Sequence, residues 1–160
     1  MKTIHSLIFI FSILVHVACG ESGDNTESNT GDDVAGDEMI AEVAEPDIVG
    51  SYMDEYMTSH VITALSWTQT YVGSEPSVFH FLSVNNENDF IIAENDAMNE
   101  YSPSLFSRFD WVTIDGQLWF CQTTYNAETA EGAEATPAAD ASDVSVSGCG
   151  ASPWSSLNIQ

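Results

Sequence analysis

SRFDWVTIDGQLWFCQTTY, residues 107–125, decides the fold of this chain. Two runs rich in apolar and β-branched residues flank the pair Asp115-Gly116. Asp-Gly between such runs is the strongest short-range signal for a β-hairpin, because a two-residue type I′ turn needs positive φ at both central positions. The sequence therefore predicts a hairpin in which Trp111 faces Phe120 and Asp110 faces Cys121.

The two faces of this hairpin differ in character, because side chains alternate between faces along a strand. One face carries the residues that we expect in the core, namely Phe109, Trp111, Leu118 and Phe120. The other face carries Arg108, Asp110, Val112, Trp119 and Cys121. This second face is too apolar to stand in water, so we expect another segment to cover it.

The C-terminal segment is the expected cover. Residues 126–148 are acidic and rich in alanine, and they lead to Cys149 within SGCGASPW. In an exported protein Cys121 and Cys149 are the expected disulfide partners, and the bridge would lay Trp154 over Trp119 and Val112. Thr136-Pro137 predicts the cap and first position of one short helix.

Four further strands are expected before the hairpin, separated by turn signals rich in Gly, Asn and Pro. They are Ile48–Met53, His60–Trp67, Ser77–Val84 and Asp89–Ala93. The third is apolar on both faces, which predicts a strand that is central in the sheet or covered on both sides, and a buried His80. The fold class is therefore all-β, a small antiparallel meander or barrel with a disulfide-tethered C-terminal tail.

The chain opens with Lys2 and an apolar run from Ile4 to Val17. This pattern indicates a signal peptide over residues 1–18, because the run is shorter than the roughly 20 apolar residues that span a bilayer. The following residues, 19–45, are expected to form a disordered acidic tether, since they have no aromatic side chains to bury. The β domain is expected over residues 46–160.

Two cleavage patterns overlap at the end of the leader. Val15-His16-Val17-Ala18-Cys19 resembles the lipobox of bacterial lipoproteins, with His16 where leucine is usual. That resemblance implies that Cys19 is acylated, for example with palmitate, and anchors the protein in the cell envelope, at the outer membrane or the cell surface. The alternative is an ordinary secretory cut at Ala18-Cys19-Gly20, which would release the protein.

The charge of the chain excludes several partners. All 25 Asp and Glu follow the leader, and Arg108 is the single Lys or Arg that accompanies them, which gives a formal charge of −24. Such a field repels nucleic acid, anionic membrane surfaces and phosphorylated ligands. No cofactor is expected, and neither an EF-hand loop nor zinc-ligand spacing is present in the sequence.

Candidate site residues are few. We expect Arg108 to pair with a carboxylate such as Asp110, with a carboxylate-ligand clamp or stacking on Tyr52 or a tryptophan as alternatives. The aromatic candidates for ligand contact are Tyr52, Trp67, Tyr71 and Trp119, which would otherwise belong to the core. Neither a nucleophile elbow nor a phosphate loop is present, so no catalytic residue is assigned and enzymatic activity is not expected.

Two family resemblances add to these expectations. Ile48-Val49-Gly50-Ser51-Tyr52 resembles the Gly-x-Trp first strand of lipocalin-type barrels, which implies a closed barrel, a small apolar ligand and a cation over the Tyr52 ring. Residues 47–157 resemble uncharacterised acidic lipoproteins of myxobacterium-like bacteria, on the motifs Ser107-Arg-Phe-Asp-Trp111, Trp119-Phe-Cys-Gln122, Thr136-Pro-Ala-Ala-Asp140 and Gly148-Cys-Gly150. The second resemblance implies location and fold.

Three functions remain open on the sequence. The leading hypothesis is a binding or structural module at the membrane surface, with a protein or a small molecule as partner. The second is a lipocalin-like carrier of a small apolar ligand, held in a cavity among Tyr52, Phe79, Phe81 and Trp111. The third is a secreted hydrolase that uses converging carboxylates or a histidine.

Overall fold

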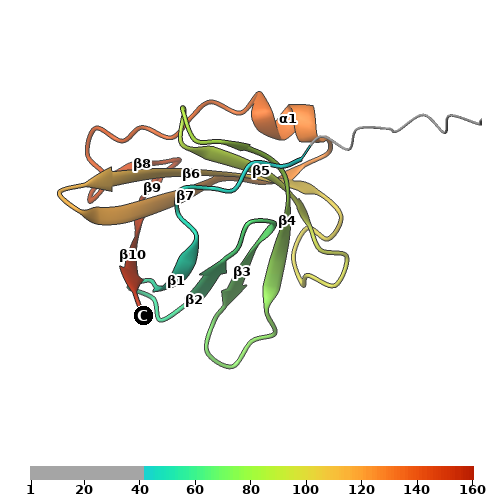
Figure 1. Cartoon of the computed structure of the whole chain (residues 1–160), viewed down its shortest axis with the longest axis horizontal. Coiled ribbons are helices and arrows are strands. Elements are labelled where there is room, and N and C mark those ends of the chain that lie inside the picture. The colour runs from blue at the N-terminus through green and yellow to red at the C-terminus, as the bar shows by residue number, and fades with distance from the viewer. Residues whose placement is uncertain (1–41) are drawn as a thin grey trace, which may run out of the picture. The chain divides into compact units, whose positions relative to one another are not determined.

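Eight antiparallel strands close into a barrel in a computed structural model that describes residues 42–160 (Figure 1). Around the barrel the order is β1-β10-β7-β6-β5-β4-β3-β2. The strands are β1 Gly50–Met53, β2 Ser59–Ile62, β3 Ser66–Thr70, β4 Ser77–Asn85, β5 Phe90–Asn95, β6 Phe106–Ile114, β7 Gln117–Ala127 and β10 Ser155–Ile159. The all-β prediction is confirmed, and of the two predicted architectures, meander or barrel, the structure has the barrel. The leader, Cys19 and the tether up to Ala41 lie outside the described residues.

The hairpin β6–β7 forms as predicted. Asp115 and Gly116 make the turn with φ values of 51° and 81°, both positive as a type I′ turn requires. The register is confirmed from Ile114 opposite Gln117 to Asp110 opposite Cys121. The face that carries Phe109 and its alternating neighbours lies in the core.

Aromatic rings fill the centre of the barrel. Trp67 is fully buried, with its ring centroid 4.7 Å from that of Phe109 and 5.2 Å from that of Phe120. The Phe79 ring meets Phe109 edge to face at 4.9 Å. Aromatic pairs of this kind contribute about 0.5–1.5 kcal/mol each beyond the area they bury. The barrel interior is therefore a packed core.

The predicted strand His60–Trp67 is wrong, because two strands occupy this region. The chain turns between β2 and β3, where Oγ1 of Thr63 accepts hydrogen bonds from the backbone N–H groups of Leu65 and Ser66 at 3.2 and 3.0 Å. A threonine side chain that satisfies nearby backbone donors competes with the strand ladder. His60 and Trp67 thus lie on neighbouring strands, with His60 paired to Gln69 and Ile62 to Trp67.

Strand β4 is central, between β3 and β5, but the alternative that it is covered on both faces and the prediction of a buried His80 are wrong. Phe79 and Phe81 point inward, while His80 and Leu82 are exposed on the outer surface. The register with β5 shifts between Phe81 and Ser83, and Val84 then packs against the core. A bulge of this kind changes which residues face inward, and simple alternation does not anticipate it.

The predicted position of the helix is wrong by about two turns. Helix α1, Ala130–Glu134, begins after Thr129, whose side chain accepts a hydrogen bond from the N–H of Gly132. Thr136-Pro137 follows the helix instead of starting it, because Thr129 is the residue that caps the exposed N–H groups. The helix covers the outer face of β5 and β6 (Figure 1), where Ala133 packs against Phe90 and Ile92.

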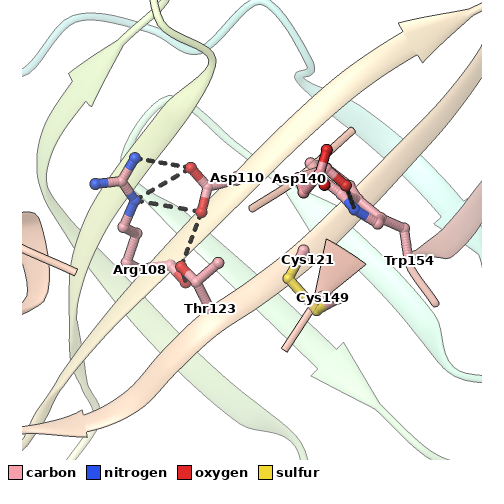
Figure 2. The surroundings of a disulfide bond; sticks show 7 residues. All are labelled: Arg108, Asp110, Cys121, Thr123, Asp140, Cys149 and Trp154. Atoms are coloured by element: carbon pink, nitrogen blue, oxygen red, sulfur yellow. Dashed lines mark hydrogen bonds and ion pairs between the residues drawn. A yellow bond between two sulfur atoms is a disulfide. The ribbon is translucent and has the colours of Figure 1, made fainter. Parts of the chain in front are cut away.

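The C-terminal segment covers the outer face of β6 and β7, as predicted. Cys121 and Cys149 form the expected disulfide, next to a short hairpin of β8, Gly148–Cys149, and β9, Ser152–Pro153. Buried Trp154 lies in one cluster with Val112 and Trp119. Its indole Nε1 donates a hydrogen bond to the carbonyl of Asp140 at 3.0 Å (Figure 2).

Beyond Trp154 the chain becomes a barrel strand, which the sequence reading missed. Strand β10 pairs with β7 through Leu157 opposite Leu118 and with β1 through Ile159 opposite Tyr52. Of its five residues only Leu157 is buried, so its alternation signal is weak. At the other end of the domain, Val43 packs against the core and the carbonyl of Glu45 accepts a hydrogen bond from Asn86, so contacts with the barrel precede Pro46.

Candidate functional site

One end of the barrel carries a cluster of pockets, and we call it the tyrosine end. The β1–β2 turn, the β3–β4 turn, the β5–β6 loop and the end of β7 meet there. Four of the five tyrosines of the chain lie on these segments, and all four are exposed: Tyr56, Tyr71, Tyr101 and Tyr125. Exposed tyrosines present a rigid apolar ring and a hydroxyl, which suits them to binding surfaces.

The tyrosine end contains an inner pocket of about 190 Å³. Its lining has no charged side chain and consists of amides, hydroxyls and three aromatic rings. The lining residues are Gln69, Ser77, Phe79, Asn95, Asn99, Tyr101, Gln122 and Tyr125. The inner pocket therefore offers polar recognition groups above the aromatic floor of the core.

A larger outer cleft of about 490 Å³ adjoins the inner pocket. The two share Gln69, Ser77 and Tyr101 in their linings. Tyr71 and the carboxylates Glu75 and Glu100 line the outer cleft only. The neighbouring carboxylate of Glu100 raises the pKa of the Tyr101 hydroxyl, by hydrogen bonding first and by its charge second. The tyrosine end thus passes from a neutral interior to an acidic rim.

Two asparagines hold the loops of the tyrosine end in place. Asn99 accepts a hydrogen bond from the N–H of Val78 and donates one to its carbonyl, both at 2.8 Å. Asn95 donates to the carbonyls of Ser102 and Tyr125 at 2.8 and 2.9 Å. Because these bonds tie the β5–β6 loop to β4 and β7, both amides are committed to structure.

Two other amides keep groups free for a ligand. Nε2 of Gln69 is buried and has no hydrogen-bond partner among the described residues. Gln122 donates through Nε2 to the hydroxyl of Ser107 at 3.0 Å, and no described residue donates to its Oε1. A buried donor without a partner costs about 1–3 kcal/mol. The residues that line the inner pocket therefore include one donor and one acceptor that no described residue pairs.

Of the residues predicted for ligand contact, only Tyr71 lies at the tyrosine end. Trp67 is fully buried in the core, and Trp119 is half-buried beneath the C-terminal segment. Tyr52 is buried near the opposite end, where its hydroxyl donates to the carbonyl of Ile48 at 3.1 Å and burial raises its pKa. The Tyr52 ring lies so close to Gly50 that a Cβ there would meet the hydroxyl at 2.8 Å.

Arg108 pairs with Asp110, as predicted, on the outer face of β6. Its Nε and Nη2 contact the carboxylate at 2.8–3.2 Å (Figure 2). Nη1 donates to the carbonyls of Glu134 and Thr136 at 2.9 Å. The guanidinium lies 4.2 Å above the Phe90 ring, so a ring other than Tyr52 or a tryptophan, the alternatives considered, stacks against it. All three nitrogens are engaged within the protein, and the side chain is buried.

The two histidines after the leader have opposite environments. His60 is buried between Asp54 and Trp67, and burial lowers its pKa. His80 is exposed on β4 and contacts Asp96 at 2.8 Å, which lowers the pKa of that carboxyl. Among residues 42–160, no three His, Cys, Asp or Glu side chains converge to hold a metal ion.

A second pocket, of about 480 Å³, lies at the opposite end of the barrel near the β6–β7 turn. Its apolar lining comes from Ile48, Tyr52, Leu118, Leu157 and Ile159. The residues expected to surround an internal cavity, namely Tyr52, Phe79, Phe81 and Trp111, all belong to the packed core.

The sequence reading missed Gln69, Gln122 and three of the exposed tyrosines. Tyr56 and Tyr101 occupy turn segments, and an aromatic residue in a turn is exposed more often than one in a strand, so the sequence did carry a signal for these two. Tyr125 lies near the end of strand β7, where no such signal applies. Gln69 and Gln122 lie within strands and face the barrel interior at its end, and no local pattern distinguishes such glutamines from surface ones. Their proximity depends on barrel closure, which brings β3 and β7 to one mouth.

No protein-family model, curated protein sequence or solved structure matches this chain. Among the described residues, no helix is long and apolar enough to cross a membrane. The functional proposal therefore rests on the geometry and chemistry of the chain itself.

Proposed function

We propose that this protein is a binding module of the cell envelope, anchored by a lipid on Cys19, which binds its ligand at the tyrosine end. The observation that carries the proposal is the buried, unpartnered Nε2 of Gln69, a residue of the pocket that exposed Tyr101 and Tyr125 also line. Folded proteins pair nearly all of their buried polar groups, so an unpartnered donor in a pocket lining supports a ligand as its partner.

The chemical character of the pocket favours binding over catalysis. Its side chains are amides, hydroxyls and phenols, which recognise a ligand by hydrogen bonding and do not exchange protons near neutral pH. The buried histidine, His60, is already bonded to Asp54 and Trp67. The proposed function is therefore reversible binding of a ligand without chemical conversion.

The anchor follows from the resemblance of Val15–Cys19 to a lipobox. Two or more acyl chains on Cys19 would hold the protein stably at the membrane, since about 0.8 kcal/mol is gained per buried CH₂. The acidic residues 20–45 would then act as a tether that repels anionic lipid head groups. The ligand end of the barrel is thereby kept in the aqueous phase, at the outer membrane or cell surface.

The test is native mass spectrometry of the protein extracted gently from membranes of its own host. We expect acyl chains on Cys19 and a non-covalent small-molecule adduct in the wild type, with the adduct lost in the variant Tyr101→Ala/Tyr125→Ala. The variant Leu65→Ala removes an exposed apolar side chain from the β2–β3 turn and should keep the adduct. An adduct that survives in the tyrosine variant, or a wild type without one, would contradict the proposal for this site.

The pocket at the opposite end favours a second candidate function, carriage of a small, mainly apolar molecule. Its volume of about 480 Å³ and the aliphatic side chains of Ile48, Leu118, Leu157 and Ile159 suit the apolar part of such a ligand, and Asp47, Thr113, Gln117 and Asn158 add polar groups to the lining. For this function the variant Leu118→Asn, which places an amide in the pocket wall, should release the adduct while the tyrosine variant retains it. The two proposals thus predict opposite results: the adduct is lost from Tyr101→Ala/Tyr125→Ala if the ligand binds at the tyrosine end, and from Leu118→Asn if it binds at the opposite end.

A further inference from the structure

We infer that the ligand of the tyrosine end is a neutral saccharide chain, bound with one ring in the inner pocket and the next over the outer cleft. This inference rests on the proposed function, because it names the ligand class of the same site. It follows from four features of that end: its charge, its open hydrogen-bonding groups, its tyrosines and its size.

Charge excludes an anionic ligand. Glu75 and Glu100 flank the outer cleft, and Arg108, the single Lys or Arg among residues 42–160, is buried against Asp110 on the outer wall. No cation is therefore available to neutralise a carboxylate, phosphate or sulfate at this end. A cationic ligand is not favoured either, because the inner pocket has no carboxylate to pair with a buried positive charge.

The two unpaired amide groups that belong to the inner pocket favour a ligand with hydroxyl groups. Nε2 of Gln69 needs an acceptor, and Oε1 of Gln122 can accept from a donor. A hydroxyl is a donor and an acceptor at once, and a saccharide ring carries several around its edge. A purely apolar ligand would leave Nε2 of Gln69 without an acceptor and would seal Oε1 of Gln122 away from water, at a cost of about 1–3 kcal/mol for that oxygen.

The tyrosines suit the other surface of a saccharide ring. Tyr101 and Tyr125 line the inner pocket, and Tyr71 lines the outer cleft, which Tyr101 borders as well. A pyranose ring presents C–H groups on its faces and hydroxyls at its edge, so it can lie on an aromatic face while the phenol and amide groups bond its edge. The floor of the inner pocket, Phe79, adds a further aromatic contact.

The size of the pockets indicates a chain of rings. The inner pocket, at about 190 Å³, is smaller than the roughly 300–1,000 Å³ of a site for a drug-sized molecule, which suits a single ring. The outer cleft is continuous with it through Gln69, Ser77 and Tyr101 and measures about 490 Å³. A disaccharide or longer chain would occupy both.

The test is isothermal titration of the folded protein with cellotetraose, maltotetraose and triacetylchitotriose, with an anionic heparin tetrasaccharide as the charged comparison. We expect saturable binding of at least one neutral chain and no binding of the anionic one. The variants Gln69→Met and Tyr101→Ala should each weaken that binding by at least tenfold, while Leu65→Ala leaves it unchanged.

Gln69→Met also separates binding from folding. It replaces an unpartnered buried amide with an apolar side chain of similar shape, so the melting temperature should stay the same or rise while binding is lost. A glutamine with a purely structural role would instead lower the melting temperature on substitution. Chemical shifts of labelled tyrosines should move on titration for Tyr71, Tyr101 and Tyr125 and stay fixed for buried Tyr52.

Failure of this inference can be told apart from failure of the proposed function. If no neutral oligosaccharide binds, and the adduct released from the native protein yields no monosaccharide on acid hydrolysis, the saccharide is excluded while the binding site stands. If an oligosaccharide binds equally well to Gln69→Met and Tyr101→Ala, the tyrosine end is not its site. If the native adduct survives in the tyrosine variant, the proposed function itself fails.

Discussion

The indole Nε1 of Trp67 donates a 3.1 Å hydrogen bond to Nδ1 of His60. An indole N–H can only donate, so Nδ1 must be unprotonated. The imidazole proton therefore sits on Nε2, which faces Oδ2 of Asp54 at 3.2 Å. This arrangement fixes one neutral tautomer of His60 inside the barrel, and a second proton would have to displace the indole.

Stability should consequently fall as the pH is lowered below the ordinary histidine pKa. Burial lowers the pKa of His60, against the opposing effects of Asp54 and Glu55. The unfolded chain then binds a proton, near its ordinary pKa of about 6.5, before the folded protein does. The stability due to neutral His60 is complete above that value and is lost as the pH falls through the lower pKa of the folded state.

The measurement is the melting temperature between about pH 8 and about pH 5 for the wild type and His60→Gln. Glutamine can accept from Trp67 and donate to Asp54 without titrating, so the variant should start lower and lose less on acidification. His80→Gln is the control, since His80 is exposed on the outer wall. Equal losses in the wild type and His60→Gln would rule out this account.

Reduction of the disulfide should loosen the C-terminal segment and leave the β6–β7 hairpin intact. Cys121 and Cys149 are 28 residues apart, and closing a loop of this length stabilises by about 3–4 kcal/mol in the chain-entropy model. Hydrogen exchange of the oxidised protein and of Cys121→Ala/Cys149→Ala should differ in residues 139–154 and agree in the hairpin. An identical near-UV spectrum and unfolding midpoint in both proteins would contradict the expectation.

Removal of the guanidinium of Arg108 should be costly, because Asp110 is buried and would keep only the hydroxyl of Thr123, at 2.8 Å, as a side-chain donor. Arg108→Met should destabilise by about 3–5 kcal/mol, the usual cost of breaking a buried ion pair. The double variant Arg108→Met/Asp110→Leu should recover a large part of this loss, since it leaves no charge unpaired. Urea titration gives each free energy, and Glu131→Gln on α1 is the exposed control.

Gly148 should tolerate no side chain, in contrast to Gly150. Both have positive φ, at 102° and 60°, but a Cβ at Gly148 would collide with the carbonyl of Asp140 and lie 3.0 Å from the Trp154 indole, whereas Gly150 has open space. Gly150→Ala should cost about 1–2 kcal/mol for its backbone conformation alone. Gly148→Ala should cost more and expose Trp154, seen as a red shift of its fluorescence. Equal unfolding midpoints in the two variants would refute the difference.

Sequence reasoning succeeded where the decisive contacts are local. The alternation of side chains along β6 puts Arg108 beside Asp110. The register that the Asp115-Gly116 turn sets between β6 and β7 identifies the apolar face that Trp154 covers. The disulfide followed because an exported chain with an unsatisfied cysteine on that face needs a partner.

Sequence reasoning failed where packing between residues far apart in the chain decides which side chains are buried. Barrel closure turns Phe79 and Phe81 of β4 inward, which leaves His80 outside, while His60 on β2 becomes the buried histidine. The bulge after Phe81 is set by pairing with β5 and changes only which later residues of β4 face the core. The tyrosine end was missed for the same reason. Gln69 and Gln122 are far apart in the chain and line one pocket only because the barrel closes.

Strand β10 lies between β1 and β7, so closure joins segments about a hundred residues apart, as in the hydrogen bond from Asn158 to the carbonyl of Met53. Pairing at such a separation is slow, because the entropy of the intervening loop is lost before the contact forms. Until β10 docks, β1 and β7 are open edges that can pair with another chain. We therefore expect the docking of residues 155–159 against β1 to limit the folding rate, and a delay in that docking to prolong the aggregation-prone state.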